Sequence, residues 1–127
     1  MTSHDDSLIF VATNDISGKT RGKAFPAANL LSRRSRGVGW TPTNVMITCF
    51  DTIGDGPFGA LGDLLLVPDE ATEVSLNPGD DLPTERLMLG DIHELDGTPW
   101  SCCTRSILKA AIARLERVAN LRAVAAF

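Results

Sequence analysis

The sequence contains little cysteine and little histidine, and both shortages exclude classes of site. The three cysteines, Cys49, Cys102 and Cys103, are odd in number and two of them are adjacent. This pattern argues against a secreted disulfide framework and predicts reduced thiols. The two histidines, His4 and His93, lie far from any cysteine pair with the C-x-x-C-like spacing of a structural zinc site. The sequence therefore predicts no metal centre built on cysteine.

The sequence also lacks a long apolar run, and its first six residues are polar and acidic. A membrane helix needs about 20 consecutive apolar residues, and a signal peptide begins with a basic and then an apolar segment. We therefore expect a cytoplasmic protein that does not contact a membrane. The length of 127 residues predicts one domain, and a hydrophobic fraction of 43% with 22% charged residues is typical of globular proteins.

The net charge of −4 hides a segregation of charge along the chain. Six of the twelve basic residues lie between Lys19 and Arg36, where no acidic residue occurs, and twelve of the sixteen acidic residues lie between Asp51 and Asp96. Two interpretations stay open: two solvated faces of opposite sign, or a dipolar domain that docks on copies of itself or on a larger partner. Nucleic acid is not expected as a partner, because the acidic part of the chain would repel phosphates.

Hydrophobic patterning predicts an α+β domain with a mainly antiparallel sheet, covered on one face by helices. Strands are expected in five segments, at residues 7–14, 19–26, 45–50, 64–67 and 86–94. The first two should form a hairpin, and Pro68 should end the fourth. A short helix should follow Pro26 and end at Gly37, and an amphipathic helix should span residues 105–118.

The remaining segments are expected to be loops, except at the end of the chain. Residues 37–44 and 51–62 contain glycine and proline without periodicity, and residues 77–83 form an acidic turn region. Thr104 or Ser101 is the expected cap of the long helix. The final residues, 121–127, resemble the opening of a further strand.

Tests for catalytic motifs identify no complete catalytic site. Gly18-Lys19-Thr20 resembles the end of a phosphate loop, but the earlier glycine is missing and a hairpin offers no helix amino terminus to phosphate. His93 has no convincing serine or cysteine partner for nucleophilic catalysis, and it is interpreted as a surface or core-edge residue. Asp69 and its neighbours are interpreted as a turn held by local hydrogen bonds. Asp63 could point into the space that the glycine-rich loop surrounds, or it could cap a turn.

Four motifs, taken in order, carry a resemblance that extends from about Leu8 to the end of the chain. They are N-D-I-S-G-K-T-R-G-K-A-F-P at residues 14–26, G-D-L-L-L-V-P-D at 62–69 followed by Thr72, D-G-T-P-W at 96–100 and T-R-S-I-L-K at 104–109. The series resembles the opening hairpin, the S-D-x-x-L-x-P-D-x-x-T segment, and the closing turn and R-x-I-L-K helix of the first domain of the glutamine synthetase family.

This resemblance implies a β-grasp-like fold and an ATP-dependent ligase, which activates glutamate as γ-glutamyl phosphate and lets an amine displace the phosphate. In the family, the active site lies between the amino-terminal domain of one subunit and the catalytic domain of its neighbour, within large rings. The expected partner is therefore a catalytic domain of the same or a neighbouring subunit, in a homo-oligomer. ATP and Mg²⁺ or Mn²⁺ are expected to bind only with that catalytic domain. The resemblance implies that residues 1–127 are the amino-terminal domain alone, inactive by itself.

The resemblance also implies which residues face the amine. Ammonium-using members carry F-D-G-S-S with an aspartate that binds ammonium, whereas Trp40 and Thr41 occupy the corresponding loop here, with Thr41 roughly at the aspartate. Asp63 matches the second aspartate of the family. Trp40, Thr41 and Asp63 are therefore expected on the amine side, and the amine is expected to be larger than ammonia: a polyamine, a monoamine or an ethanolamine-like compound.

Two alternatives to a ligase fragment stay open. The chain could be a free-standing interaction or regulatory module that docks on a full-length synthetase and modulates it. It could also be an independent small enzyme, although the motif tests find no complete nucleophile, metal or phosphate site.

Overall fold

The computed structural model describes residues 7–59, 62–77, 79 and 84–126 of the chain. The elements follow the order β1 (Leu8–Asn14), β2 (Thr20–Pro26), the 3-10 turn η1 (Ala27–Asn29), α1 (Leu30–Arg36), β3 (Val38–Trp40), the 3-10 turn η2 (Pro42–Val45), β4 (Leu64–Leu76), β5 (Glu85–His93) and α2 (Thr104–Ala119). The strands form one sheet in the order β2-β1-β5-β4-β3. Only β1 and β5 pair in parallel, so the expected α+β class with a mainly antiparallel sheet is confirmed.

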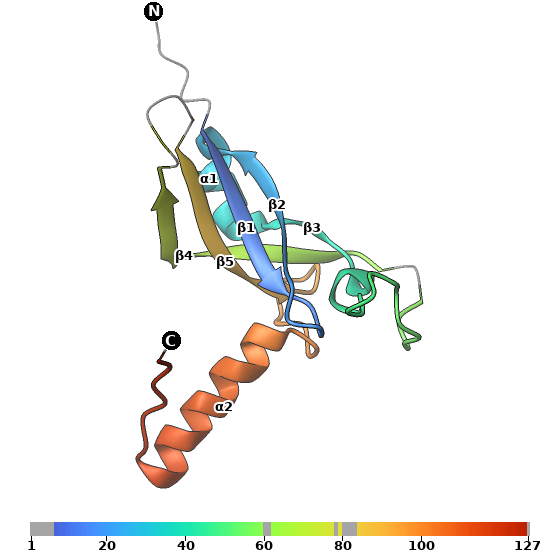
Figure 1. Cartoon of the computed structure of the whole chain (residues 1–127), viewed down its shortest axis with the longest axis vertical. Coiled ribbons are helices and arrows are strands. Elements are labelled where there is room, and N and C mark those ends of the chain that lie inside the picture. The colour runs from blue at the N-terminus through green and yellow to red at the C-terminus, as the bar shows by residue number, and fades with distance from the viewer. Residues whose placement is uncertain (1–6, 60–61, 78, 80–83, 127) are drawn as a thin grey trace, which may run out of the picture.

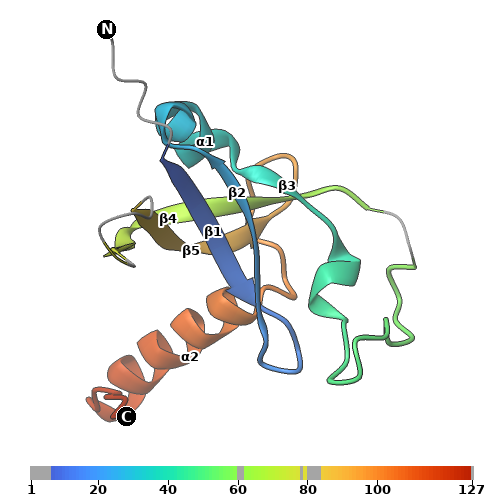
Figure 2. The ribbon, with the colours of Figure 1, turned by 45° about the horizontal axis from the view of Figure 1, so that its top comes forward.

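The core lies on one face of this sheet. Alternate residues of β1, β4 and β5 are buried, as the period of two in a strand requires. The buried apolar set comprises Ile9, Val11, Phe25, Val38, Trp40, Val45, Leu64, Leu66, Met88, Ile92, Trp100 and Cys103. The helix α1 packs beside β4, and Figure 2 shows it at one end of the sheet, above β2 and β3. The expected short helix ending at Gly37 is confirmed, since Gly37 adopts φ +62° directly after it.

The predicted β1–β2 hairpin is confirmed, with Asn14 opposite Thr20. Its turn is organised by Asp15, whose Oδ1 accepts hydrogen bonds from the amides of Ser17 and Lys19 at 3.0 and 2.9 Å. Gly18 completes the turn at φ +80°, where a side chain would be strained. Within β2, Gly22 allows close packing, because a Cβ there would lie 2.2 Å from the carbonyl oxygen of Val11.

The segment from residue 37 to residue 50 differs from the prediction. Residues 37–44 were expected to be loop, but they contain β3 and the start of η2. Residues 45–50 were expected to be a strand, but they contain the end of η2 and an isolated bridge from Ile47 to Ile53. The two segments differ because only the first has a neighbouring strand with which it can pair. Val38, Gly39 and Trp40 find β4 beside them, whereas the apolar segment that follows curls into a turn in which Gly54 N donates to Met46 O.

The strand β4 also differs, because it continues through Pro68 to Leu76. The short β3 covers only Leu64 to Leu66, so Pro68 lies where β4 has become an edge strand, and an edge tolerates a missing N–H. A register shift follows between Asp69 and Val74, where Thr72 Oγ1 accepts from Leu89 N at 2.8 Å in place of a backbone carbonyl. The predicted strand at 86–94 and the turn after it are confirmed, with His93 half-buried and its Nδ1 2.8 Å from Gly97 O. The expected turn at 77–83 lies mostly outside the described residues.

The amphipathic helix α2 is confirmed, but its packing and its cap differ from expectation. None of its residues is buried, and it contacts β1 and β5 only near its start, so that it projects away from the sheet (Figure 1) instead of covering one face. The cap is Cys103, whose Sγ accepts from Ser106 N, rather than Thr104 or Ser101. Residues 121–126 form no strand, because no partner strand lies beside them among the described residues. No described helix has the length and apolar character needed to cross a membrane.

Candidate functional site

The pairing of β3 with β4 brings the three predicted site residues to one end of the sheet. Trp40 pairs with Leu64 at the end of the β3–β4 ladder. Thr41 and Asp63 are therefore the next residues along these two antiparallel segments. Thr41 is extended, at φ −136° and ψ 150°, and continues the direction of β3 before η2 begins. Alternation along a strand then directs Thr41 and Asp63 away from the core face that Trp40 and Leu64 share.

Trp40 and Thr41 differ in how their polar atoms are satisfied. Trp40 is buried at 3% exposure, and its Nε1–H has no acceptor among the described residues. A buried donor without a partner is costly, which marks this indole as an unusual feature of the site. Thr41 Oγ1 lies 2.7 Å from Thr43 Oγ1, so the two hydroxyls of the loop form a pair. Asp63 is exposed.

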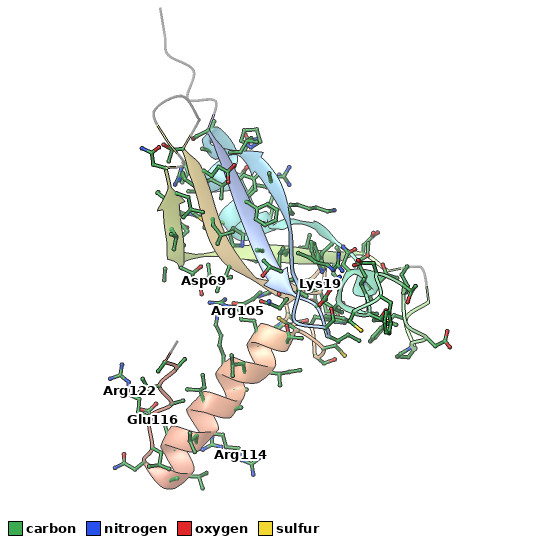
Figure 3. All side chains as sticks on the ribbon, in the orientation of Figure 1. Lys19, Asp69, Arg105, Arg114, Glu116 and Arg122 are labelled. Carbon is green, nitrogen blue, oxygen red and sulfur yellow. The ribbon has the colours of Figure 1, made fainter. Side chains whose placement is uncertain are left out.

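A network of four charges holds the loop after η2 against the β1–β2 hairpin. Asp15 accepts from Arg21 Nε at 2.6 Å, and Asp51 accepts from Lys19 Nζ at 2.9 Å and from Arg21 Nη2 at 3.1 Å. Figure 3 places Lys19 beside this loop. Asp51 has φ 57°, in the left-handed region that Asp and Asn tolerate better than most residues. The alternation from Lys19 to Pro26 predicts that Lys19 and Arg21 share a face, but the sequence did not predict their pairing with Asp15 and Asp51.

Hydrogen bonding in this network lowers two pKa values. Burial alone would raise the pKa of Asp15, but the hydrogen bonds from Ser17, Arg21 and the Lys19 amide outweigh it and lower the pKa to about 2. The hydrogen bond from Lys19, and then that from Arg21, lower the pKa of Asp51. Both carboxylates are therefore ionised at neutral pH, and the network is complete there.

Two further contacts fix the loop. Ile16 N donates to Val45 O at 3.0 Å, which joins the hairpin turn to η2. Phe58 packs on the buried Trp100, with ring centroids 5.3 Å apart and planes inclined at 58°. The segment from Val45 to Phe58, which follows Thr41 in the chain, is thus fastened at its start, its middle and its far part.

A second charged cluster joins α2 to the sheet. Arg105 donates to Asp69 at 2.6 Å and to Asp91 at 2.9 Å, and Lys109 lies 2.6 Å from Asp91. Figure 3 shows Arg105 at the root of α2, close to Asp69. The hydrogen bond from Arg105 lowers the pKa of Asp69. Asp69 makes the expected local hydrogen bond, since its Oδ1 accepts from Ala71 N at 3.2 Å, but it lies at a register shift within β4 and not in a turn between elements. Its second oxygen accepts from Arg105.

Part of the charge that is segregated in the sequence is paired in space. Lys19 and Arg21, two of the six bases between Lys19 and Arg36, are engaged by Asp15 and Asp51, while Lys23 follows Arg21 in β2. Lys23 alone among these three bases donates to a neutral group, Gly39 O at 2.6 Å.

Among the described residues, no group of three histidine, cysteine or carboxylate side chains is placed to hold a metal ion. Gly18, Lys19 and Thr20 lie in the hairpin, and Lys19 is paired with Asp51, so this segment does not offer the backbone cradle of a phosphate loop.

Comparison with known families identifies the domain. The sequence profile described as the glutamine synthetase N-terminal domain matches residues 2–100. The chain belongs to the glutamine synthetase family and carries its amino-terminal domain. No curated protein sequence matches it.

Solved structures agree with this assignment. A crystal structure described as a novel glutamine synthase homolog is 37% identical, with a TM-score of 0.81 over 87% of this chain and 27% of that chain. A GmaS complex with ADP has a TM-score of 0.69 at 22% identity, over 90% of this chain and 24% of that one. The Plasmodium falciparum glutamine synthetase has a TM-score of 0.67 at 16% identity, over 92% and 21%. This chain thus spans about a quarter of the length of these solved relatives, and the last two likenesses show the fold alone.

Proposed function

We propose that this domain supplies the amine-side wall of an active site shared between subunits of an ATP-dependent glutamate-amine ligase. Thr41 and Asp63 border that wall, and Trp40 lies behind them on the core face of the sheet. The observation that carries the proposal is the β3–β4 register, which makes Thr41 and Asp63 neighbours at the end of the sheet next to the buried Trp40.

The chemistry of this wall favours an amine larger than ammonia. Thr41 presents a hydroxyl already paired with Thr43, where ammonium-using relatives carry a carboxylate, so Asp63 is the remaining carboxylate of the three proposed site residues. A hydroxyl pair offers hydrogen bonds without the charge that concentrates a small cation. GmaS, a γ-glutamylmethylamide synthetase, shares the fold but not enough sequence to assign the amine, so the proposal rests on this loop.

The domain would be inactive alone. Glutamate activation needs ATP and divalent metal ions, and we propose that both bind with a catalytic domain. The exposed apolar side of α2, with Ile112 and Leu115 40% and 38% exposed, supports a role beside a larger partner.

An assay of the full-length ligase that carries this domain tests the proposal. With glutamate and ATP, we expect preferential turnover of a primary amine such as a monoamine or polyamine over ammonium. Thr41→Asp should raise relative ammonium turnover, and Asp63→Asn should lower turnover of the preferred amine. Glu94→Gln serves as a matched control, because Glu94 lies at the turn after β5 and should leave the amine preference unchanged. Robust, preferential turnover of ammonium by the unaltered enzyme would overturn the proposal.

The exposed face of α2 also supports a second candidate, a module that docks on a separate full-length synthetase. Size-exclusion chromatography with light scattering, in the presence of a cognate synthetase, separates the two. Stable co-elution with an altered ligase rate would favour the module; separate elution would favour the ligase domain.

A further inference from the structure

A groove lies between β2 and the segment that follows β3. Residues 20–23 of β2 line it together with Trp40, Asn44 and Ile47, and its volume is about 360 Å³. This volume is at the lower end of the range for small-molecule sites, about 300–1,000 Å³. The groove joins the two edge strands of the sheet, because Lys23 of β2 reaches the carbonyl of Gly39 in β3.

The groove carries an excess of positive charge. The neighbouring pairs cancel, since Lys19 and Arg21 are matched by Asp15 and Asp51. Lys23 forms no ion pair with a described carboxylate, and its ammonium donates one hydrogen bond, at 2.6 Å, to the neutral Gly39 O. Two of its three N–H donors therefore remain for another acceptor.

The other lining groups suit an acceptor as well. No described residue that lines the groove is acidic. Asn44 adds a side-chain amide, and Trp40 also lines the groove, although its indole Nε1–H is buried. The hydroxyl oxygen of Thr20 accepts from Asn14 Nδ2 at 3.5 Å, which leaves its own proton available to donate. Unused donors around a lysine without a carboxylate partner are the complement of an anion.

We propose that this groove binds a small organic anion through a carboxylate or phosphate group held by Lys23, with the Thr20 hydroxyl and the Asn44 amide as further donors. Of the three residues assigned to the amine-side wall, Trp40 also lines this groove, whereas Thr41 and Asp63 do not. Anion binding here would transmit to the wall through Trp40, which lines the groove directly before Thr41.

The two tryptophans make the test direct. In the ¹⁵N-labelled chain, the indole resonances of Trp40 and Trp100 are observed separately while inorganic phosphate or succinate is added at constant ionic strength, set with chloride. We expect one or both anions to move the Trp40 indole resonance saturably and to leave that of Trp100 in place. A response to phosphate alone assigns a phosphate ligand, and a response to succinate alone assigns a carboxylate.

Charge-matched variants test the role of Lys23. Lys23→Gln should weaken binding roughly tenfold, as expected for a charge-assisted hydrogen bond, whereas Lys23→Arg should retain it within about threefold. Arg36→Gln removes the same charge from the basic segment but outside the groove, and it should leave the affinity unchanged. Lys23 is exposed, so these variants should keep the fold, which the dispersion of the amide spectrum reports. No saturable response of Trp40 to either anion, or equal weakening by Lys23→Gln and Arg36→Gln, would overturn the proposal.

Discussion

Replacing Cys103 by alanine tests how α2 is joined to the sheet. Cys103 is fully buried, and its Sγ accepts from Ile92 N at 3.2 Å and from Ser106 N at 3.5 Å. Alanine removes this sulfur and both hydrogen bonds that it accepts. Loss of a helix cap costs about 1 kcal/mol, and an unsatisfied buried N–H costs about 1–2 kcal/mol more. We expect the free energy of unfolding to fall by about 2–3 kcal/mol.

Urea and thermal unfolding measure this loss. An unfolding entropy of about 2.1 cal/mol/K per residue gives about 0.27 kcal/mol/K for 127 residues, so Tm should fall by about 7–11 °C. Cys103→Ser keeps an acceptor and should lose less than half as much. Cys102→Ala is the matched control, because Cys102 is half-buried and its Sγ has only a 3.9 Å contact with the hydroxyl of Ser101.

The comparison between Cys103→Ala and Cys102→Ala decides whether the hydrogen bonds to Cys103 Sγ stabilise the protein. A fall in Tm below about 2 °C for Cys103→Ala, or an equal fall for Cys102→Ala, would show that the thiol of Cys103 contributes only its volume. The mechanism also requires an unchanged urea m-value, since the change removes two hydrogen bonds without altering the surface exposed on unfolding.

Three further predictions concern charge and close packing. Arg105→Ala should lower the free energy of unfolding by about 1–3 kcal/mol, because it leaves Asp69 without its closest partner; Arg105→Lys should restore part of it in the same urea titration. The ionised Asp15 should contribute to the free energy of unfolding above about pH 4, and this contribution should be lost as the pH falls toward its folded pKa of about 2. Asp15→Asn should remove this part of the pH dependence in an acid titration followed by circular dichroism. Gly22→Ala should lower Tm by more than about 5 °C, whereas Gly39→Ala, with open space at its Cβ, should not.

Elements with strong local signals were predictable from the sequence. The hairpin of β1 and β2 combines apolar and alternating runs with an Asp-Ile-Ser-Gly turn, and α2 repeats apolar residues at helical spacing. Such signals depend on residues close in sequence, so they survive without knowledge of the tertiary fold.

Elements that depend on a distant partner were not predictable. Val38 to Trp40 are too few and too glycine-rich to predict a strand, and they become one because β4 lies alongside. Pro68 ended a strand in the sequence reading, but β4 passes through it because β3 stops covering β4 at Leu66. Pairing partners decide strand boundaries, and a single sequence does not display them.

The candidate site also has features that the sequence predicted and features that it did not. Family resemblance selected Trp40, Thr41 and Asp63 as a group, and the register makes Thr41 and Asp63 neighbours, although their proposed role in amine binding stays a prediction. The Asp15 and Asp51 network escaped the sequence reading, because Arg21 and Asp51 are 30 residues apart.

The placement of the charges explains how the loop beside the candidate site is held although it contributes little to the core. Residues 46–59 bury few apolar groups, with Phe58 the described one that packs on Trp100, so hydrophobic contact alone would leave this segment weakly held. Asp51 supplies a second attachment through Lys19 and Arg21, two bases that the hairpin presents beside it. The pairs are partly exposed, so each contributes modestly and is screened by salt. The loop should therefore loosen at high ionic strength before the sheet unfolds, and amide hydrogen exchange at Met46 to Gly54 should rise with salt while exchange in β1 and β5 does not.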